Sequence, residues 1–536
     1  MSWKKLCSVM LVTMLFASLL VGCGSGTTSN TATKSLRFSI GAEPETLDPR
    51  KSTGVPESTA QAQLYEGLAA LDSKETPIPA TAERWEISPD GLNYKFYIRQ
   101  NAKWSNGDPV TAHDFEYAWK EVLRPEFASK YALQLYYLKN GEAYNKGKAT
   151  ADQVGVKALD DKTLEVTLEA PTAYFLALTT FHTYYPVNKK IVSTNEKWAA
   201  DPKTIIGNGP FKVSNWVHQS KLELVKNEHY WDIAKVKTDK VDLILTDNAT
   251  TALSMFENGQ LDFIDTPAPP TSEVPRLAKE NKLQVFPYLG TYYYAFNNSV
   301  APTNNAKVRK ALSLAIDREA IVKNVTKTEE VAAAAWIPPG LPDATAGEDF
   351  RKVGGDLVKY DVAEAKKLLA EAGYPDGKGF PDLTLTYNTD DRHKAIAEAI
   401  QEMWKKNLGI NVALTNQEWK VFINNRSQGN YQIARHGWIG DYPDAMTFSD
   451  LFIIGSGNNN IQYKNPEYDQ LVKLAQSTGD QTVRMKAMHD AEKMLMEDAA
   501  LAPIYYYTRP AVVKQNVKGY VRSITGLTYL KEAYVE

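Results

Sequence analysis

Cysteine is almost absent from this sequence, with two among 536 residues. Cys7 lies inside an apolar segment at the N-terminus, and Cys23 follows directly after that segment. Once the segment is set aside, one cysteine remains, so an intramolecular disulfide is excluded. A chain of this length buries enough surface to fold without disulfides, and it exceeds what one core usually serves. We therefore expect two or three domains.

The sequence also lacks a strong net charge and a second long apolar run. Lys and Arg number 61 against 64 Asp and Glu, which gives a formal charge of −3 at pH 7. This balance predicts no basic face for nucleic acid. After the N-terminal segment, no apolar run approaches the roughly 20 residues that span a bilayer. Apolar residues make up 43% of the chain, so we expect an ordinary globular body.

Enzyme signatures are missing as well. Gly455-Ser456-Gly457 lacks the spacing of a hydrolase nucleophile elbow, and Gly373 to Lys378 is too short for a phosphate-binding loop. The seven histidines form no His-Glu-x-x-His helix and are not paired at metal-ligand spacing. We expect no catalysis, no cofactor and no metal. A glycosidase pair among the 64 carboxylates stays open.

The N-terminus has the pattern of a secretory signal. Lys4 and Lys5 precede an uncharged run over residues 6–21, so residues 1–22 are predicted to be a signal peptide. The run ends in Leu20-Val21-Gly22-Cys23, which resembles the bacterial lipoprotein cleavage motif. That resemblance implies a lipid on Cys23 and an extracytoplasmic protein anchored to the bacterial cell membrane. An ordinary signal peptide with an incidental cysteine is the alternative.

Strand and helix patterns alternate through the rest of the chain. Residues 23–35 are rich in Gly, Ser and Thr and are predicted to be a flexible tether. The patterns predict strands at 36–40, 94–99, 163–168, 222–225 and 241–245, and helices at 112–123, 306–316, 362–372 and 393–407. Thr111 and Asp361 are candidate helix N-caps, and Gly373 and Gly409 candidate C-caps. The fold class is therefore α/β, with domains that are discontinuous in sequence.

Tyrosine is abundant, with 29 residues and triplets at 292–294 and 505–507. Most of these rings belong to the core or to a sheet surface. Successive side chains of a strand point to opposite faces, so a triplet places tyrosine on both. One face is suited to line a polar cleft, because tyrosine offers a flat contact and a hydroxyl. A secreted, aromatic-rich α/β protein without enzyme motifs is typical of a solute receptor.

Several motifs resemble the peptide/nickel family of extracellular solute-binding proteins. They are Ala82-Glu-Arg-Trp85, Ser88-Pro-Asp-Gly91, Asn101-Ala-Lys-Trp-Ser-Asn-Gly-Asp-Pro-Val-Thr-Ala112, Asp114-Phe-Glu-Tyr-Ala-Trp119, Gly207-Asn-Gly-Pro-Phe211 and Val308-Arg-Lys-Ala-Leu312. The resemblance extends from about residue 36 to the C-terminus. It implies a fold like the type II periplasmic binding proteins, with two lobes joined by a hinge. It further implies three domains in a monomer: domain I (36–65, 186–289 and 509–536), domain II (66–185, an insertion) and domain III (290–508).

Segments after residue 386 are similar to the oligopeptide-binding subgroup of that family. They are Tyr387-Asn-Thr-Asp-Asp-Arg-His393, Trp404-Lys-Lys-Asn-Leu-Gly409, Asn416-Gln-Glu-Trp-Lys420 and Arg435-His-Gly-Trp-Ile-Gly-Asp-Tyr442. The resemblance implies that Asp441 binds a peptide's α-ammonium and that Arg435 and His393 meet its carboxylate. Implied pocket residues are Trp419, Trp438, Tyr131, Tyr293, Tyr507 and Asn388. Solvated charge is the alternative for the two cations, and core packing for the tryptophans.

The implied function is capture of short peptides for delivery to the membrane permease of an ATP-binding-cassette importer. Cations at increasing distances from Asp441 would then select peptide length, and the one for the shortest peptides falls near Lys323 or Lys327. Ala295 follows the first tyrosine triplet where relatives can have an acidic residue. The alternatives are a receptor of the same fold for a nickel chelate or an oligosaccharide, a peptide-signal sensor, and an enzyme or surface chaperone.

Overall fold

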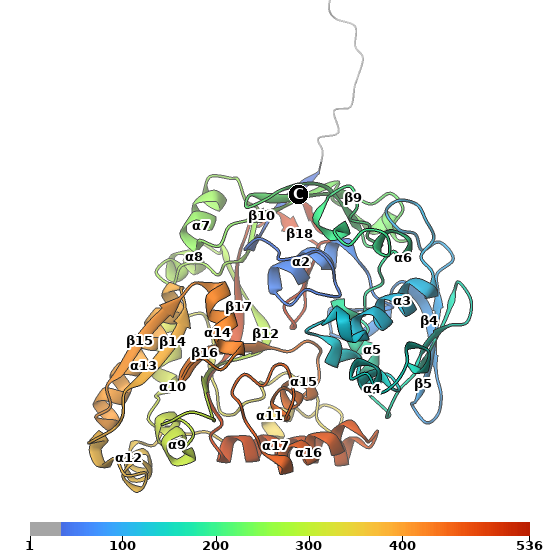
Figure 1. Cartoon of the computed structure of the whole chain (residues 1–536). Coiled ribbons are helices and arrows are strands. Elements are labelled where there is room, and N and C mark those ends of the chain that lie inside the picture. Colours follow the sequence, from blue (N-terminus) through green and yellow to red (C-terminus); the bar gives the residue numbers. More distant parts are fainter. Residues whose placement is uncertain (1–33) are drawn as a thin grey trace, which may run out of the picture. The chain divides into compact units, whose positions relative to one another are not determined.

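An eleven-stranded sheet runs through the chain in this computed structural model, which describes residues 34–536 (Figure 1). Its order is β15 (Val412–Gln417), β14 (Leu383–Asn388), β16 (Ile433–Ile439), β12 (Leu283–Phe296), β17 (Leu501–Val513), β11 (Phe263–Thr266), β1 (Ser35–Gly41), β10 (Lys240–Leu245), β9 (Lys221–Lys226) and β8 (Phe211–Val217), with β13 (Val331–Ala332) beside β17. The predicted signal peptide, Cys23 and nearly all of the predicted tether lie outside the described residues.

The long strands β12 and β17 join the two halves of this sheet. They pair antiparallel from Leu283 to Pro287, the regular register breaks, and pairing resumes at Thr291 opposite Tyr506. The predicted domain boundaries at 289/290 and 508/509 fall at or beside this break. A gap in a ladder removes hydrogen bonds that resist bending. Two strands that cross there are therefore suited to act as a hinge.

A separate four-stranded sheet lies within residues 66–185. Its order is β4 (Ala82–Ile87), β5 (Asn93–Ile98), β7 (Thr163–Thr167) and β6 (Val156–Ala158). Alternate residues of β5, among them Phe96, are buried in the apolar cluster, and α3 (Ala112–Leu123) packs against β6 and β7. In Figure 1 this region lies on the side opposite α12 (Val362–Glu371) and α13 (Asp391–Leu408).

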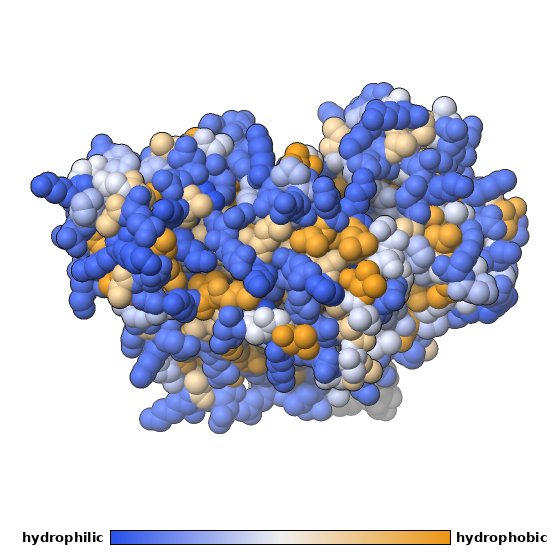
Figure 2. Space-filling view, turned by 90° about the horizontal axis from the view of Figure 1, so that it is seen from below, coloured by the Kyte–Doolittle hydropathy of each residue, from blue (hydrophilic) through white to orange (hydrophobic). Residues whose placement is uncertain are grey.

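Helices pack around the large sheet and among the loops that connect its strands. They include α2 (Val55–Leu64), α7 (Ala249–Glu257), α8 (Val274–Lys279), α9 (Ala306–Leu314), α10 (Arg318–Ile321), α11 (Phe350–Gly354), α14 (Trp419–Ser427), α15 (Met446–Ser449), α16 (Pro466–Gln476) and α17 (Gln481–Glu497). No helix in the described range is both long and apolar enough to cross a bilayer. Figure 2 shows the molecule from below, with hydrophilic residues over most of the face and apolar groups near its middle.

The predicted elements are confirmed to within a few residues at each end. Helix α3 has the predicted bounds, and its capping box includes a hydrogen bond from the Thr111 N–H to the Asp114 carboxylate at 2.9 Å. The Asp361 carboxylate accepts the N–H of Glu364 at 3.0 Å and so caps α12. Gly409 ends α13 at a φ of 70°, which glycine adopts without strain.

Apolar packing is continuous across the described body. The largest cluster of buried side chains includes Trp119 from 66–185, Leu243 from β10 and Phe448 from 290–508. Residues 35–536 accordingly form one compact unit. The division of this unit into three domains stays a prediction.

Candidate ligand-binding site

Asp441 lies two residues beyond the end of β16, in a loop that its own hydrogen bonds fix. The Asp441 N–H donates to the Thr447 hydroxyl at 3.0 Å. The indole N–H of Trp438, on β16, donates to the Thr447 carbonyl at 2.8 Å. Both ends of the loop are thus tied to Thr447 in α15, and the carboxylate has a defined position.

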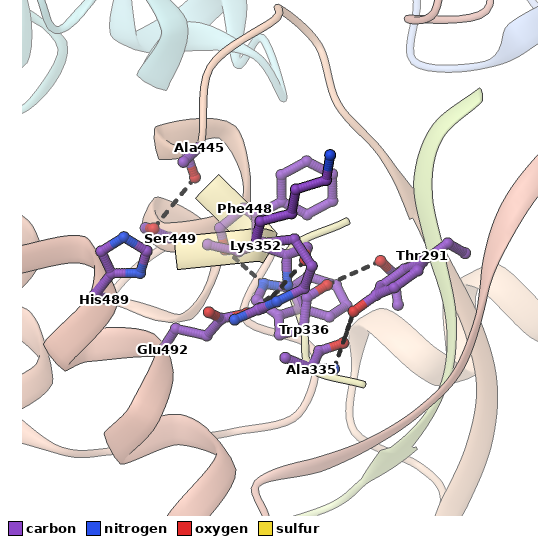
Figure 3. Close-up of polar contacts among 12 residues, drawn as sticks. Thr291, Ala335, Trp336, Lys352, Ala445, Phe448, Ser449, His489 and Glu492 are labelled. Carbon is purple, nitrogen blue, oxygen red and sulfur yellow. Dashed lines mark hydrogen bonds and ion pairs between the residues drawn. The ribbon is translucent and has the colours of Figure 1, made fainter. Parts of the chain in front are cut away.

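Trp336 also holds α15 in place (Figure 3). Its indole N–H donates to the Phe448 carbonyl at 2.9 Å, and its own carbonyl accepts the Thr291 hydroxyl at 2.8 Å. Thr291 is where β12 resumes its pairing after the register break. The loop that carries Asp441 is therefore connected through Trp336 to the strand that passes through the predicted hinge.

The Asp441 carboxylate contacts side chains from the 66–185 region. Gln134 donates its Nε2 to Asp441 Oδ2 at 2.8 Å, and the Tyr131 hydroxyl lies 3.4 Å from Oδ1. No ion pair to Asp441 occurs within the described part of the chain. Burial, together with the nearby carboxylate of Asp450, raises the pKa of Asp441 well above its usual value. The Oε1 atom of Gln134 is also buried and has no partner among the described residues. The surroundings of Asp441 therefore offer hydrogen-bond acceptors and have no cation paired with them among the described residues.

Arg435 lies on β16, opposite Tyr294 of β12, so its side chain shares a face with Tyr292. Its guanidinium carbon is 5.0 Å from the centroid of the Tyr292 ring, and one terminal nitrogen donates to the Tyr507 hydroxyl at 3.1 Å. A Cβ at Gly437 would collide with that hydroxyl, so the glycine permits the approach. Within the described chain no carboxylate pairs with Arg435, and its Nε is buried without a partner.

His393 lies in the first turn of α13, near the same tyrosine. Its Nδ1 is 3.4 Å from the Tyr292 hydroxyl and 3.7 Å from the Asp390 carboxylate. Burial first, and then Arg435 and Arg392, lower the pKa of His393 well below its usual value. The amide oxygen of Asn388, at the end of β14, is buried without a partner in the described chain. Arg435 and His393 thus converge on Tyr292, and their binding of a peptide carboxylate stays a prediction.

Arg426 and Tyr292 belong to this cationic end, and the sequence reasoning missed both. The Arg426 guanidinium carbon lies 5.4 Å from the Phe422 ring, and burial lowers the pKa of Arg426 to about 10. Its Nε has no partner in the described chain. Arg426 follows Trp419 by seven residues, two turns of α14, which was a usable signal. Tyr292 belongs to a triplet visible in the sequence, but only the pairing of β12 with β16 places it beside Arg435.

The other predicted pocket residues are spread more widely. Tyr293 is fully buried between Trp336 and His436, with ring centroids at 4.9 and 4.6 Å. Trp419 is 47% exposed and stacks on Phe422 at 6.3 Å. Lys323 and Lys327 are both exposed. The structure therefore places Asp441 beside Tyr131, and Arg435 near Tyr507 and His393. Trp419 is partly exposed and belongs to neither group.

Comparison with known proteins settles the family. Residues 76–460 match the bacterial extracellular solute-binding proteins, family 5 (middle region). The chain belongs to this family. The oligopeptide-binding protein OppA of Bacillus subtilis is 42% identical over 547 residues, which cover 99% of each chain. Family membership confirms the recognition made from the motifs.

Solved structures of relatives share the fold. OppA of Haemophilus influenzae, in complex with RPPGFSPFR, matches with a TM-score of 0.84 and 35% identity over 94% of this chain and 99% of that one. The murein tripeptide-binding protein MppA of Escherichia coli matches at 0.85 with 36% identity, over the same shares. A structure of MppA described as the unliganded open form matches at only 0.69. The protein described here is therefore less similar to that open arrangement.

Proposed function

We propose that this protein binds short oligopeptides outside the cytoplasm and delivers them to the permease of an ATP-binding-cassette importer. Family membership and relatives named for oligopeptide binding support the proposal. The observation that carries it is a pair of opposite, unsatisfied charges. Asp441 lacks a cation, and Arg435 lacks a carboxylate, within the described chain. A peptide brings the missing charge to each end.

The cost of burying an unpaired charge favours a ligand that brings a cation to Asp441 and an anion to Arg435. An ionised group buried without a partner costs several kcal/mol, so each site gains when a ligand supplies the counter-charge. At the acidic end, the α-ammonium would meet the Asp441 carboxylate and the free Oε1 of Gln134. Charge-assisted hydrogen bonds of this kind are roughly twice as strong as neutral ones.

Length selection would come from the separation of the groups that can donate a hydrogen bond to a carboxylate. Arg435 and His393 occupy different elements, β16 and α13, and would meet the terminal carboxylates of peptides of different length. Arg426 adds a further cation that is suited to a carboxylate. Recognition of charges common to all peptides leaves their side chains free, and bridging waters accommodate them at little cost.

The anchor forms the second part of the proposal. Cys23 would become the first mature residue and carry lipid, and residues 23–35 would act as a tether. Two or more acyl chains are needed for stable anchoring. Tethering keeps the receptor near its permease, since confinement raises the effective concentration.

Native mass spectrometry of the purified protein tests the ligand class. We expect a mixture of bound peptides, and competition calorimetry should show that an N-acetylated tripeptide fails to displace a free one. Equal competition by the acetylated peptide would favour a receptor of the same fold for another solute, such as a nickel chelate or an oligosaccharide. Cleavage of the peptides on incubation would favour an enzyme instead.

A further inference from the structure

A second buried carboxylate lies near Asp441 and is not used by the proposal above. The segment 441–450 contains three aspartates: Asp441, Asp444 and Asp450. Asp444 forms an ion pair with Arg484 of α17. Neither Asp441 nor Asp450 forms an ion pair within the described residues. Of these three carboxylates, only Asp444 pairs with a cation among the described residues.

Tyrosine hydroxyls from two regions gather around Asp450. The Tyr137 hydroxyl is 3.4 Å from Asp450 Oδ2 and also 3.4 Å from the Tyr442 hydroxyl. The Tyr174 ring stacks on Tyr442 with centroids 5.2 Å apart and an interplanar angle of 3°. Tyr137 and Tyr174 belong to the 66–185 region, so this cluster spans the same interface as Asp441.

Tyr174 supplies an independent sign that the cluster awaits a ligand. Its side chain is only 6% exposed, and its hydroxyl has no hydrogen-bond partner in the described chain. Burial first raises the pKa of that hydroxyl, Arg484 opposes the shift, and Asp444 and Asp450 add to it. The hydroxyl is thus buried, unsatisfied and close to the carboxylates. Leaving a buried hydroxyl without a partner is unfavourable, because its hydrogen bonds to water are lost.

The charge balance indicates what is missing. One α-ammonium neutralises Asp441 and leaves the buried Asp450 without a cation, which disfavours its ionised form. Burial raises the pKa of Asp450 to about 7, so near neutral pH its charge is only partly present unless a cation joins it. A lysine ammonium has three donors and no acceptor, and it would be matched by one carboxylate and neighbouring hydroxyls.

We propose that Asp450, with the hydroxyls of Tyr137, Tyr174 and Tyr442, is a second cation subsite that binds the basic side chain of a peptide's first residue. This inference rests on the proposed function. The first side chain leaves the same Cα as the ammonium held by Asp441, and Asp441 and Asp450 are close enough to interact electrostatically. The protein would therefore favour peptides that begin with lysine or arginine.

Calorimetry with three peptides tests this subsite: Lys-Ala-Ala, norleucine-Ala-Ala, which keeps the stem without the charge, and Ala-Ala-Ala. We expect the native protein to bind the lysine peptide about tenfold or more tightly than the norleucine peptide, because a close charge pair that is shielded from water strengthens binding. Asp450→Asn should remove this preference. Asp247→Asn, an exposed aspartate outside the site, should retain it. Tyr137→Phe, which removes one hydroxyl, should reduce it and serves if Asp450→Asn does not fold.

Three results would overturn the subsite: equal binding of the lysine and norleucine peptides, a preference that survives Asp450→Asn, or norleucine-peptide binding that strengthens in potassium or ammonium salts over choline. The last result would assign the cluster to a free monovalent ion. Failure of the native protein to bind Ala-Ala-Ala at all would instead contradict the proposed function.

Discussion

The acidic and basic ends of the site are built differently. At the acidic end, Asp441 and Asp450 contact Gln134, Tyr131 and Tyr137 from the 66–185 region. At the basic end, Arg435, Arg426 and His393 have their described hydrogen-bonding and ring partners inside 290–508. One end is therefore completed by two regions, and the other by one region alone.

This difference assigns separate roles to the two ends. If the hinge at β12 and β17 opens, the carboxylates regain water, whereas the cations keep their protein neighbours. Closure then desolvates the carboxylates, and a ligand cation offsets that cost. We expect changes at the acidic end to affect closure for every peptide, and changes at the basic end to depend on peptide length.

The largest expected effect is at Asp441. Asp441→Asn keeps an acceptor for Gln134 but removes the charge, so the affinity for any free tripeptide should fall about 100-fold or more. Calorimetry measures the loss, and circular dichroism checks that the fold is kept. Asp247→Asn is the matched control and should bind normally. Tight binding of tripeptides by Asp441→Asn would show that the Asp441 charge is not needed for peptide binding.

At the basic end, we expect losses that vary with length. Arg435→Gln should weaken the binding of peptides of some lengths about 10- to 100-fold. His393→Gln should weaken the binding of peptides that are longer than those affected by Arg435→Gln. Affinities for a series of alanine peptides from two to five residues provide the measurement. Identical length profiles for the two variants would contradict separate carboxylate positions.

A smaller effect is expected from pH. Burial in the closed protein raises the pKa of Asp450 to about 7, above the value of a solvated aspartate. The closed form therefore takes up a proton, and Ala-Ala-Ala should bind more tightly at pH 6 than at pH 8. The other groups that interact electrostatically with Asp450 are Asp441, Asp444, Tyr137, Tyr174, Tyr442 and Tyr468, and Arg484 pairs with Asp444. Burial raises the pKa of each of these tyrosines, so they stay protonated in this range.

Calorimetry in buffers of different ionisation enthalpy detects this proton. We expect uptake on binding of Ala-Ala-Ala and little or none on binding of Lys-Ala-Ala, because the lysine ammonium replaces the proton. Asp450→Asn should remove the uptake. The same uptake for both peptides would show that Asp450 does not meet the first side chain.

The smallest expected effect is at the anchor. A form without residues 1–22 that carries Cys23→Ala should bind peptide within about twofold of the lipidated protein, since the described body, residues 35–536, forms a unit of its own. Partition into membranes should be lost in the same form. Weaker peptide binding by this form would show that the anchor and the site are not separate.

The sequence was most informative where local patterns decide the structure. The bounds of α3 followed from Thr111 and the apolar spacing, and the motifs between Ala82 and Leu312 identified the family. Gln134 was missed because it lies 307 residues from Asp441 in sequence, and no local pattern connects the two. Asp450 was missed for the same reason: its importance depends on Tyr137, which comes from another region.

A thermodynamic cycle on Asp441 and the peptide amine is the most direct test of the site. Affinities of Ala-Ala-Ala and its N-acetylated form are measured with the native protein and with Asp441→Asn. We predict that acetylation weakens binding about 100-fold in the native protein and changes it little in the variant, which corresponds to a coupling of about 2–3 kcal/mol. The same loss on acetylation in both proteins would contradict recognition of the α-ammonium by Asp441.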